Sequence, residues 1–374
     1  MQVALWRFFG LIALMVSGLL AGCGGGCLGC GGGGSGAEPP AAAPPPPAVV
    51  MQSFAYVATR GSESIRIYRI EDSGALVSVD LVQAGEGARF VAVHPSNRFA
   101  YTANSGDNNV SMFALDPGTG RLSGRVDVAA GNGARLIRIH PSGNFAYVTN
   151  HDDSTISAYG IDAGTGMLTP AGAALPVGAE PGAIVIDPTG RFAFVQVAAG
   201  VESYSIAASG ALGLITAVAM GAPVNDIALA PSGRFLYAAA ADGTVSRLSI
   251  DGGGALSVVT PFTTGGVGEQ AIYIEPTGRV AYVTRLGDNS IAAFGVEPLT
   301  GDLDLAPAGA VSLGAAPGSV AMGPTGEFLY ATSEGGDTVS VFAVQQATGA
   351  LTAFGTPVAA DFAPVGITIA SFPR

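Results

Sequence analysis

The chain has 374 residues, of which 48% are hydrophobic and only 12% charged, and its formal net charge is −12. Such an acidic chain lacks the basic surface that nucleic-acid binding requires, so we expect no nucleic-acid partner. All sixteen basic residues are arginine. Without lysine, neither a Schiff-base mechanism nor a Walker-type phosphate loop is available.

Residues 1–22 have the pattern of a secretory signal peptide. One arginine precedes an apolar run over residues 8–20, which is too short for a stable membrane span. The run ends in Leu20-Ala21-Gly22-Cys23, which resembles the lipobox of bacterial lipoproteins. That resemblance implies that Cys23 carries several acyl chains, which are enough to anchor a protein stably in the cell envelope. Gly24 stands where an inner-membrane lipoprotein usually has Asp, so we expect anchoring in the outer membrane.

Residues 23–50 are expected to form a flexible tether. The segment 24–36 is almost entirely glycine, and residues 37–50 carry six prolines, typical of a semi-rigid polyproline spacer. Cys27 and Cys30 follow Cys23 at short spacings, but no fourth ligand is near and lipidation would occupy one thiol. We therefore expect neither a metal site nor a cofactor. The two remaining thiols could pair in an oxidising compartment.

A short segment, Pro-Ser/Thr-Gly/Asn-x-Phe/Val-Ala/Leu-Tyr/Phe, recurs at intervals of roughly 45 residues, which is typical of a β-propeller. Its copies begin at Pro95, Pro141, Pro188, Pro231, Pro276 and Pro324. The second half occurs alone at residues 54–57, and a matching first half lies near the C-terminus at residues 366–371. A repeat divided between the two ends predicts a ring closed by pairing of N- and C-terminal strands.

Each repeat alternates apolar and polar residues with period two, which indicates strands. One repeat shows the order clearly, with strands expected at residues 90–93, 99–103, 110–114 and 122–128. The second-strand aromatic residue and a later Gly-x-Leu each occur seven times. We therefore predict an all-β fold, a seven-bladed propeller of four-stranded antiparallel blades over residues 51–374.

The repeats resemble the seven-bladed lactonase family, which includes 6-phosphogluconolactonase, and the related YVTN-repeat propellers. Asp187-Pro188-Thr189-Gly190-Arg191-Phe192, its five relatives and Tyr147-Val148-Thr149-Asn150 carry the resemblance. The resemblance implies a catalytic signature of Pro-His-His on one innermost strand. Here Gly182 and Ala183 stand where the two histidines are expected, so the usual base is missing.

Candidate ligand-binding residues share one register at the start of the innermost strands. Arg89 and Arg135 occupy it in neighbouring blades, and Asn225 and Gln270 occupy it further around the ring. Two adjacent guanidinium groups would bind a carboxylate or a phosphate, unless acids such as Glu269 or Asp226 neutralise them.

Candidate catalytic residues lie in one loop between the second and third strands. His151 is the only histidine expected at this end of the propeller, and Asp152 or Asp153 could orient it as a base. Equivalent loops read Gly-Asp-Asn or Gly-Asp-Thr, so the acids could instead be ordinary turn residues. His94 and His140 fall in turns at the opposite end, where we expect only structural roles.

Two functions remain open from the sequence. The first is a non-catalytic or altered-substrate envelope lipoprotein that binds a small anionic ligand, or another envelope protein, at the channel mouth. The alternative is an exported lactone hydrolase, a carboxylic ester hydrolase that uses His151 with Arg89 and Arg135. In either case we expect a monomer attached to the membrane through Cys23.

Overall fold

The computed structural model describes residues 51–373 except residue 267, without the side chains of residues 259, 260, 269 and 305–308. The expected signal peptide, the tether and Cys23, Cys27 and Cys30 lie outside these residues. Val49–Arg374 form a compact unit by themselves. Among the described residues, no helix is long and apolar enough to cross a bilayer.

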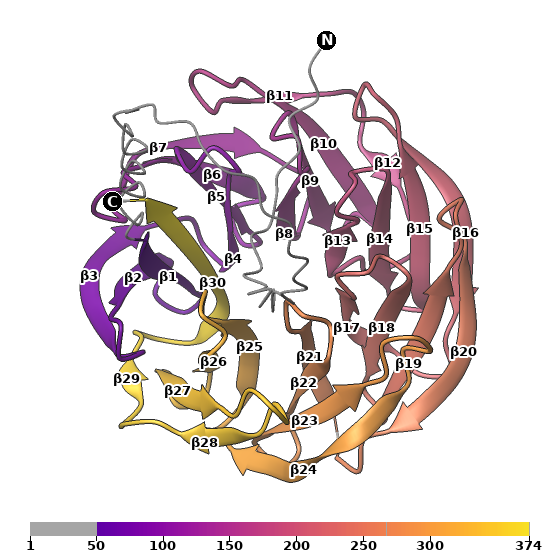
Figure 1. Ribbon diagram of the computed structural model, residues 1–374. Helices are drawn as coiled ribbons and strands as arrows, with labels where there is room; N and C mark the ends of the chain where they lie inside the picture. Colours follow the sequence, from indigo (N-terminus) through magenta and orange to yellow (C-terminus); the bar gives the residue numbers. More distant parts are fainter. Residues whose placement is uncertain (1–50, 267, 374) are drawn as a thin grey trace, which may run out of the picture. The chain divides into compact units, whose positions relative to one another are not determined.

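Seven antiparallel sheets are arranged as blades around a central channel (Figure 1), which confirms the predicted propeller. Blade 1 contains β1 (Met51–Thr59), β2 (Ser64–Ile70), β3 (Leu76–Gln83) and β30 (Pro364–Pro373). Blade 2 contains β4 (Ala88–Val93), β5 (Phe99–Asn104), β6 (Asn109–Leu115) and β7 (Leu122–Ala129). Blade 3 contains β8 (Ala134–Ile139), β9 (Phe145–Asn150), β10 (Thr155–Ile161), β11 (Leu168–Pro170) and β12 (Leu175–Pro176).

The remaining four blades repeat this order along the chain. Blade 4 contains β13 (Ile184–Ile186), β14 (Phe192–Val197), β15 (Gly200–Ile206) and β16 (Leu212–Ala219). Blade 5 contains β17 (Val224–Leu229), β18 (Phe235–Ala240), β19 (Thr244–Ile250) and β20 (Leu256–Thr263). Blade 6 contains β21 (Glu269–Ile274), β22 (Val280–Arg285), β23 (Ser290–Val296) and β24 (Leu303–Ser312). Blade 7 contains β25 (Pro317–Met322), β26 (Phe328–Ser333), β27 (Thr338–Val344), β28 (Leu351–Ala353) and β29 (Val358–Ala359).

Blades 3 and 7 differ slightly from the predicted four-strand pattern because their outer strand is interrupted. In blade 3, β11 and β12 both pair with β10, and in blade 7, β28 and β29 both pair with β27. Each pair of short strands therefore takes the place of a single outer strand. The outer strand is the most exposed part of a blade, so a break there leaves the core intact.

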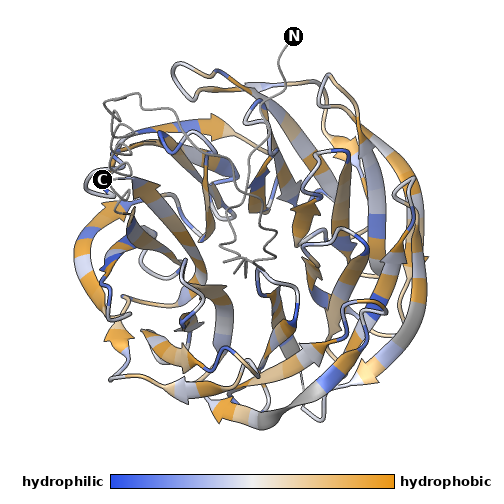
Figure 2. Ribbon diagram, viewed as in Figure 1, coloured by the Kyte–Doolittle hydropathy of each residue, from blue (hydrophilic) through white to orange (hydrophobic). Residues whose placement is uncertain are grey.

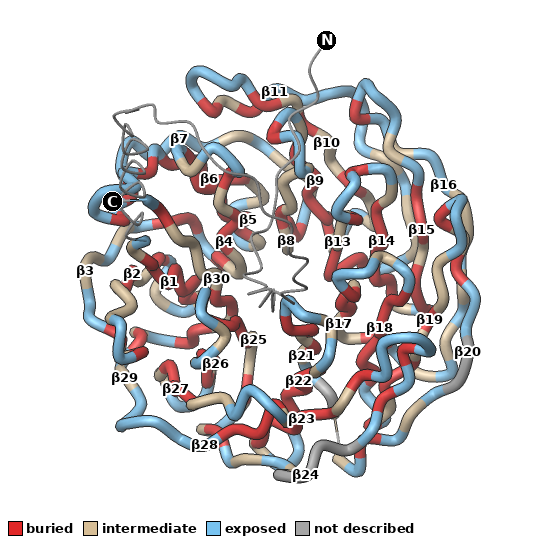
Figure 3. The backbone as a smooth tube through the Cα atoms, viewed as in Figure 1, coloured by how far each residue is buried: buried red, intermediate tan, exposed pale blue. Residues whose placement is uncertain are grey.

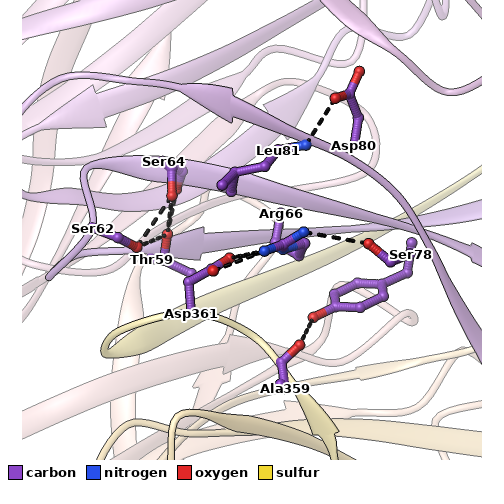
Figure 4. A network of polar contacts seen from close by, with 10 residues as sticks. Thr59, Ser62, Ser64, Arg66, Ser78, Asp80, Leu81, Ala359 and Asp361 are labelled. Carbon is purple, nitrogen blue, oxygen red and sulfur yellow. Dashed lines mark hydrogen bonds and ion pairs between the residues drawn. The ribbon is translucent and has the colours of Figure 1, made fainter.

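The ring closes in blade 1, where the two ends of the chain pair. β30 is antiparallel to β1, and Tyr56 lies opposite Thr368, as the divided repeat predicts. Arg66 lies on β2, and Asp361 lies just before β30. Two of the guanidinium nitrogens of Arg66, Nε and Nη2, each donate a hydrogen bond of 2.7 Å to the carboxylate of Asp361 (Figure 4). Bidentate pairs of this kind fix geometry as well as adding energy. The closing strand is thus held by its ladder and by the segment that precedes it.

Buried residues are concentrated in the middle strands of the blades, while loops and outer strands are exposed (Figure 3). Hydrophobic and hydrophilic residues alternate in bands along many of these strands (Figure 2), as expected for sheets that pack on their neighbours. A second-strand tyrosine is fully buried in six blades, and Phe194 takes its place in blade 4. These rings fill the space between adjacent blades and account for the recurring aromatic position.

Candidate functional site at the mouth of the central channel

The innermost strands place their first residues around one end of the channel, here called the mouth. Arg89 follows the first residue of β4, and Arg135 follows the first residue of β8 in the next blade. Both line a cavity of about 890 Å³ that extends along the channel. Asn225 and Gln270 line the same cavity. The structure therefore brings the four predicted ligand-binding residues to one site.

The guanidinium groups of Arg89 and Arg135 have no hydrogen bond and no ion pair with any side chain that the structure describes. The Nε atom of Arg89 is buried and without a partner. Burial, with the nearby positive charges of Arg135 and Arg60, lowers the pKa of Arg89 to about 10. Burial also lowers the pKa of Arg135. Both groups remain cations at neutral pH, so the mouth holds two positive charges at a desolvation cost.

A second ring of residues at the mouth follows the second strand of each blade. In six blades the backbone N–H of this residue donates to the carbonyl immediately before the innermost strand; for His151 the acceptor is Gly133, at 3.0 Å. In blade 4, Ala198 donates to Ala179, which lies further ahead of β13. The ring consists of Arg60, Ser105, His151, Ala198, Ala241, Leu286 and Glu334. This shared register explains why a loop residue such as His151 lies close to the innermost strands.

His151 and Asp152 share a smaller cavity of about 410 Å³ with Arg60, Arg89 and Arg135. The Nδ1 atom of His151 lies 2.9 Å from Oδ1 of Asp152, and the histidine side chain is 29% exposed. An imidazole that donates from Nδ1 to a carboxylate has its Nε2 lone pair available as a base. The loop thus presents a basic nitrogen beside the two arginines.

Asp153 has a different position from His151 and Asp152. Its carboxylate accepts hydrogen bonds from the backbone N–H of Asn132 at 2.7 Å and from the Asn132 side chain at 2.8 Å. Asp107 makes the same kind of bond to the backbone of Glu86 at 2.9 Å. The structure therefore gives Asp153 a role in holding the adjoining loop, and it does not line either cavity at the mouth.

Sequence reasoning missed an ion pair at the mouth. Arg60 in blade 1 bonds Glu334 in blade 7, and both residues line the main cavity. Both occupy the same register as His151, one residue after the second strand. Applying that register to all seven blades would have identified them.

Two charged residues lie deeper in the channel. The Arg138 guanidinium stacks on the Phe90 ring, with Cζ 4.6 Å from the ring centroid, and its Nε donates to the Ile184 carbonyl at 3.0 Å. The Oδ2 atom of Asp226 accepts a hydrogen bond from the backbone N–H of Ile272 at 3.0 Å. Burial raises the pKa of Asp226 to about 6, against the opposing effect of that hydrogen bond. Asp226, one of the acids that the sequence indicated as a possible partner of the arginines, thus attracts Arg135 without forming an ion pair with it.

The remaining two histidines have structural roles, as predicted. His94 Nε2 lies 2.8 Å from the Gly143 carbonyl, and His140 Nε2 lies 2.8 Å from the Gly190 carbonyl. Each also bonds a serine two residues later. Neither is available for chemistry at the mouth. Among the described residues, no group of three or more His, Cys, Asp or Glu side chains is placed to hold a metal ion.

A profile of the family described as "Lactonase, 7-bladed beta-propeller" matches residues 51–225 and 227–365. The chain belongs to this lactonase family. A provisionally named 6-phosphogluconolactonase from Arthroderma benhamiae is 34% identical over 65 residues, which are 17% of this chain and 16% of that protein. The family assignment therefore rests on the profile, which covers nearly the whole propeller.

Solved structures of other proteins share the fold of this lactonase-family chain. A provisionally named 6-phosphogluconolactonase from Bacteroides fragilis has a TM-score of 0.76 at 18% identity, covering 85% of this chain and 98% of its own. The periplasmic gluconolactonase of Pseudomonas aeruginosa has a TM-score of 0.74 at 19% identity, covering 87% of this chain and 100% of its own. At such identities the likeness shows a common fold and no more.

Proposed function

We propose that this lactonase-family propeller binds a small anionic ligand at the channel mouth, between Arg89 and Arg135. The observation that carries the proposal is that these two neighbouring cations have no acid partner among the described side chains, although one of their nitrogens is buried. Burying an unpaired charge is costly. A carboxylate or a phosphate would supply the missing partner through charge-assisted hydrogen bonds.

The start of the innermost strand in blade 4 favours ligand binding over the hydrolysis that the family resemblance implies. Gly182 and Ala183 occupy the positions where the resemblance implies two histidines. The backbone N–H of Gly182 donates to the Gln196 carbonyl at 3.0 Å, and that of Ala183 donates to Gln196 Oε1 at 3.2 Å. A Cβ atom added to Gly182 would lie 2.1 Å from Gln196 Oε1, so even a small side chain there needs Gln196 to move. The segment as it stands offers no side-chain base at these two positions.

A second function, hydrolysis of an exported lactone, is favoured by one specific observation. His151, held by Asp152, opens into the same cavity as Arg89 and Arg135. In this scheme His151 Nε2 takes a proton from water while the water oxygen attacks the lactone carbonyl carbon. Arg89 and Arg135 stabilise the resulting oxyanion. The ring C–O bond then breaks and the leaving oxygen takes the proton, which yields a hydroxy acid.

The proposed place of action is the cell envelope, with Cys23 lipidated. β1 runs from Met51, opposite Pro373, to Thr59, opposite Pro364 near the mouth. The described part of β1 therefore begins at the end of blade 1 opposite Arg89 and Arg135.

Calorimetric titration with simple carboxylates and phosphate monoesters tests the binding proposal. We expect saturable binding that weakens with salt, because charged contacts supply the affinity. In parallel, a panel of lactones tests hydrolysis by the parent and by His151→Gln. Turnover that His151→Gln abolishes supports the second function, and binding without turnover supports the first. Absence of both overturns the proposed site.

A further inference from the structure

The channel cavity changes character with depth. In the main cavity, the described charged side chains at the mouth end are Arg60, Arg89, Arg135 and Glu334, which sum to +2. Two acids, Glu86 and Asp152, line the smaller cavity beside them. Deeper in, Arg138 and Asp226 carry opposite charges, so the lower part, here called the shaft, has no net charge from its described side chains. Within the main cavity, a cationic end thus leads into a part without net charge.

Polar groups of the shaft are largely engaged in bonds between neighbouring blades. Thr368 Oγ1 donates to the Val91 carbonyl at 2.6 Å, Arg138 Nε donates to the Ile184 carbonyl, and Asp226 accepts from the Ile272 N–H. In each case the side chain of one blade bonds the backbone of the next. These groups hold the ring together, which leaves them less able to recognise a polar ligand.

Much of the rest of the shaft lining is apolar, although Ser319 also lines it. Immediately below the two arginines lie Phe90 and Leu136, each only partly buried. Further along, the half-buried side chains facing the cavity are aliphatic or aromatic: Ile139, Val185, Ile186, Leu229, Tyr273 and Ile369. Cavities of roughly 300–1,000 Å³ with mostly apolar walls and a few polar groups are typical ligand sites.

We propose that the ligand of this site is an amphiphilic monoanion, with its carboxylate or phosphate between Arg89 and Arg135 and an apolar body in the shaft. This inference rests on the proposed anion site and adds the chemical class of what it holds. A polyhydroxylated acid fits less well, because its many hydroxyls would lose water while few of the described shaft side chains, Ser319 among them, could replace it. An alkyl or aryl body would instead exclude water from Phe90, Leu136 and Tyr273.

The test is a chain-length series on the segment 49–374, which is a compact unit with all the described strands and core. Butanoate, hexanoate and octanoate are titrated below their micelle-forming concentrations, with gluconate as the polar comparison. Each buried methylene is worth about a four-fold gain in affinity in the ideal case. We expect octanoate to bind at least about tenfold more tightly than butanoate, and gluconate to bind no more tightly than butanoate.

Two kinds of variant test separately how the anionic group and the apolar body of the ligand are bound. Leu136→Ser should flatten the chain-length series while butanoate binding is kept, and Leu136→Ala should do the same more weakly if the serine variant does not fold. Arg89→Ala with Arg135→Ala should weaken every member of the series by a similar factor. The matched control is Leu299→Ser, since Leu299 is 73% exposed and lies away from the channel.

The outcomes distinguish the two proposals. A flat series in the parent protein, or gluconate binding more tightly than octanoate, overturns the amphiphile inference and leaves the anion site standing. Octanoate binding that persists in the double arginine variant also overturns it, because the apolar body would then bind elsewhere. If none of the four acids binds, the proposed anion site fails as well.

Discussion

The hydroxyl of Tyr147 in blade 3 donates a 2.8 Å hydrogen bond to the backbone carbonyl of Gly210 in blade 4, 63 residues later. The same tyrosine-to-glycine bond joins five other pairs of neighbouring blades. The seventh position has Phe194, which has no hydroxyl to offer Gly254. The two residues that count the repeats in the sequence are thus in contact between blades, and burial raises the pKa of Tyr147 to about 12.

Removing one of these bonds should destabilise the ring measurably. We expect Tyr147→Phe to lower the free energy of unfolding by about 1–2 kcal/mol, because the Gly210 carbonyl would lose its partner in a buried site. Phe194→Tyr should have the opposite effect, up to about 1 kcal/mol, by offering a hydroxyl to Gly254. Urea denaturation of both variants measures the two effects. Equal stability of all three proteins would show that the bonds do not hold the blades.

Ring closure by β30 should be essential for cooperative unfolding. Deleting residues 364–374 removes the innermost strand of blade 1 and breaks its pairing with β1. We expect the truncated chain to lose its single unfolding transition and to aggregate, because the edge of β1 becomes available to other chains. Deleting residues 1–48 is the matched control and should leave the transition unchanged, since Val49–Arg374 form a separate compact unit. A truncated chain that still unfolds in one sharp transition would contradict this role of β30.

Asp226 should make stability depend on pH. Its pKa in the folded chain is raised to about 6. The native state therefore holds this proton more tightly than the unfolded state, and stability falls as pH rises from about 4 to about 6. We expect Asp226→Asn to remove that fall and to gain about 1–3 kcal/mol relative to the parent at pH 7.

Chemical denaturation at a series of pH values measures this effect. The comparison at pH 3 is the internal control, because the parent carboxyl is then protonated and only the change to an amide remains. If parent and variant show parallel stability curves between pH 4 and 6, Asp226 is not the group responsible.

Lipidation of Cys23 should determine where the protein is found. Cys23→Ala removes the thiol that would be acylated, so we expect the protein to move from the membrane fraction to the soluble fraction. Cell fractionation followed by immunoblotting measures this. Cys27→Ala is the matched control and should stay with the membrane. A Cys23→Ala variant that remains as firmly bound as the parent would contradict the lipoprotein proposal.

The blades could be predicted from the sequence because their signals are local and repeated. The period, the alternation and the divided repeat at residues 366–371 specify strand order and ring closure without knowledge of side-chain packing. The register of Arg89 and Arg135 followed directly from that alignment. The strand order and ring closure of the described chain could therefore be predicted, but not the interrupted outer strands of blades 3 and 7.

The details of the channel were harder to predict because its strands are irregular. The register shifts between Val224 and Asp226 and again between Ala134 and Leu136. At such a bulge strict alternation fails, so both Asn225 and Asp226 line the cavity. Period-two alternation alone would place only one of these two side chains in the channel, so the sequence indicated Asp226 only as one of several acids that could neutralise the arginines. Arg60 and Glu334 were missed for another reason, since the position one residue after the second strand was considered only for the loop of His151.

The central claim, an anion site formed by Arg89 and Arg135, is tested most directly by one comparison of binding affinities. The double variant Arg89→Ala with Arg135→Ala is set against Arg98→Ala with Arg191→Ala, which makes the same charge change at two exposed arginines that stack on Phe99 and Phe192. Calorimetry with an anionic ligand should show binding weakened by about 2–4 kcal/mol in the first variant and unchanged in the second. Equal affinity in both double variants would contradict the account, because the anion would then respond to overall charge and not to the mouth.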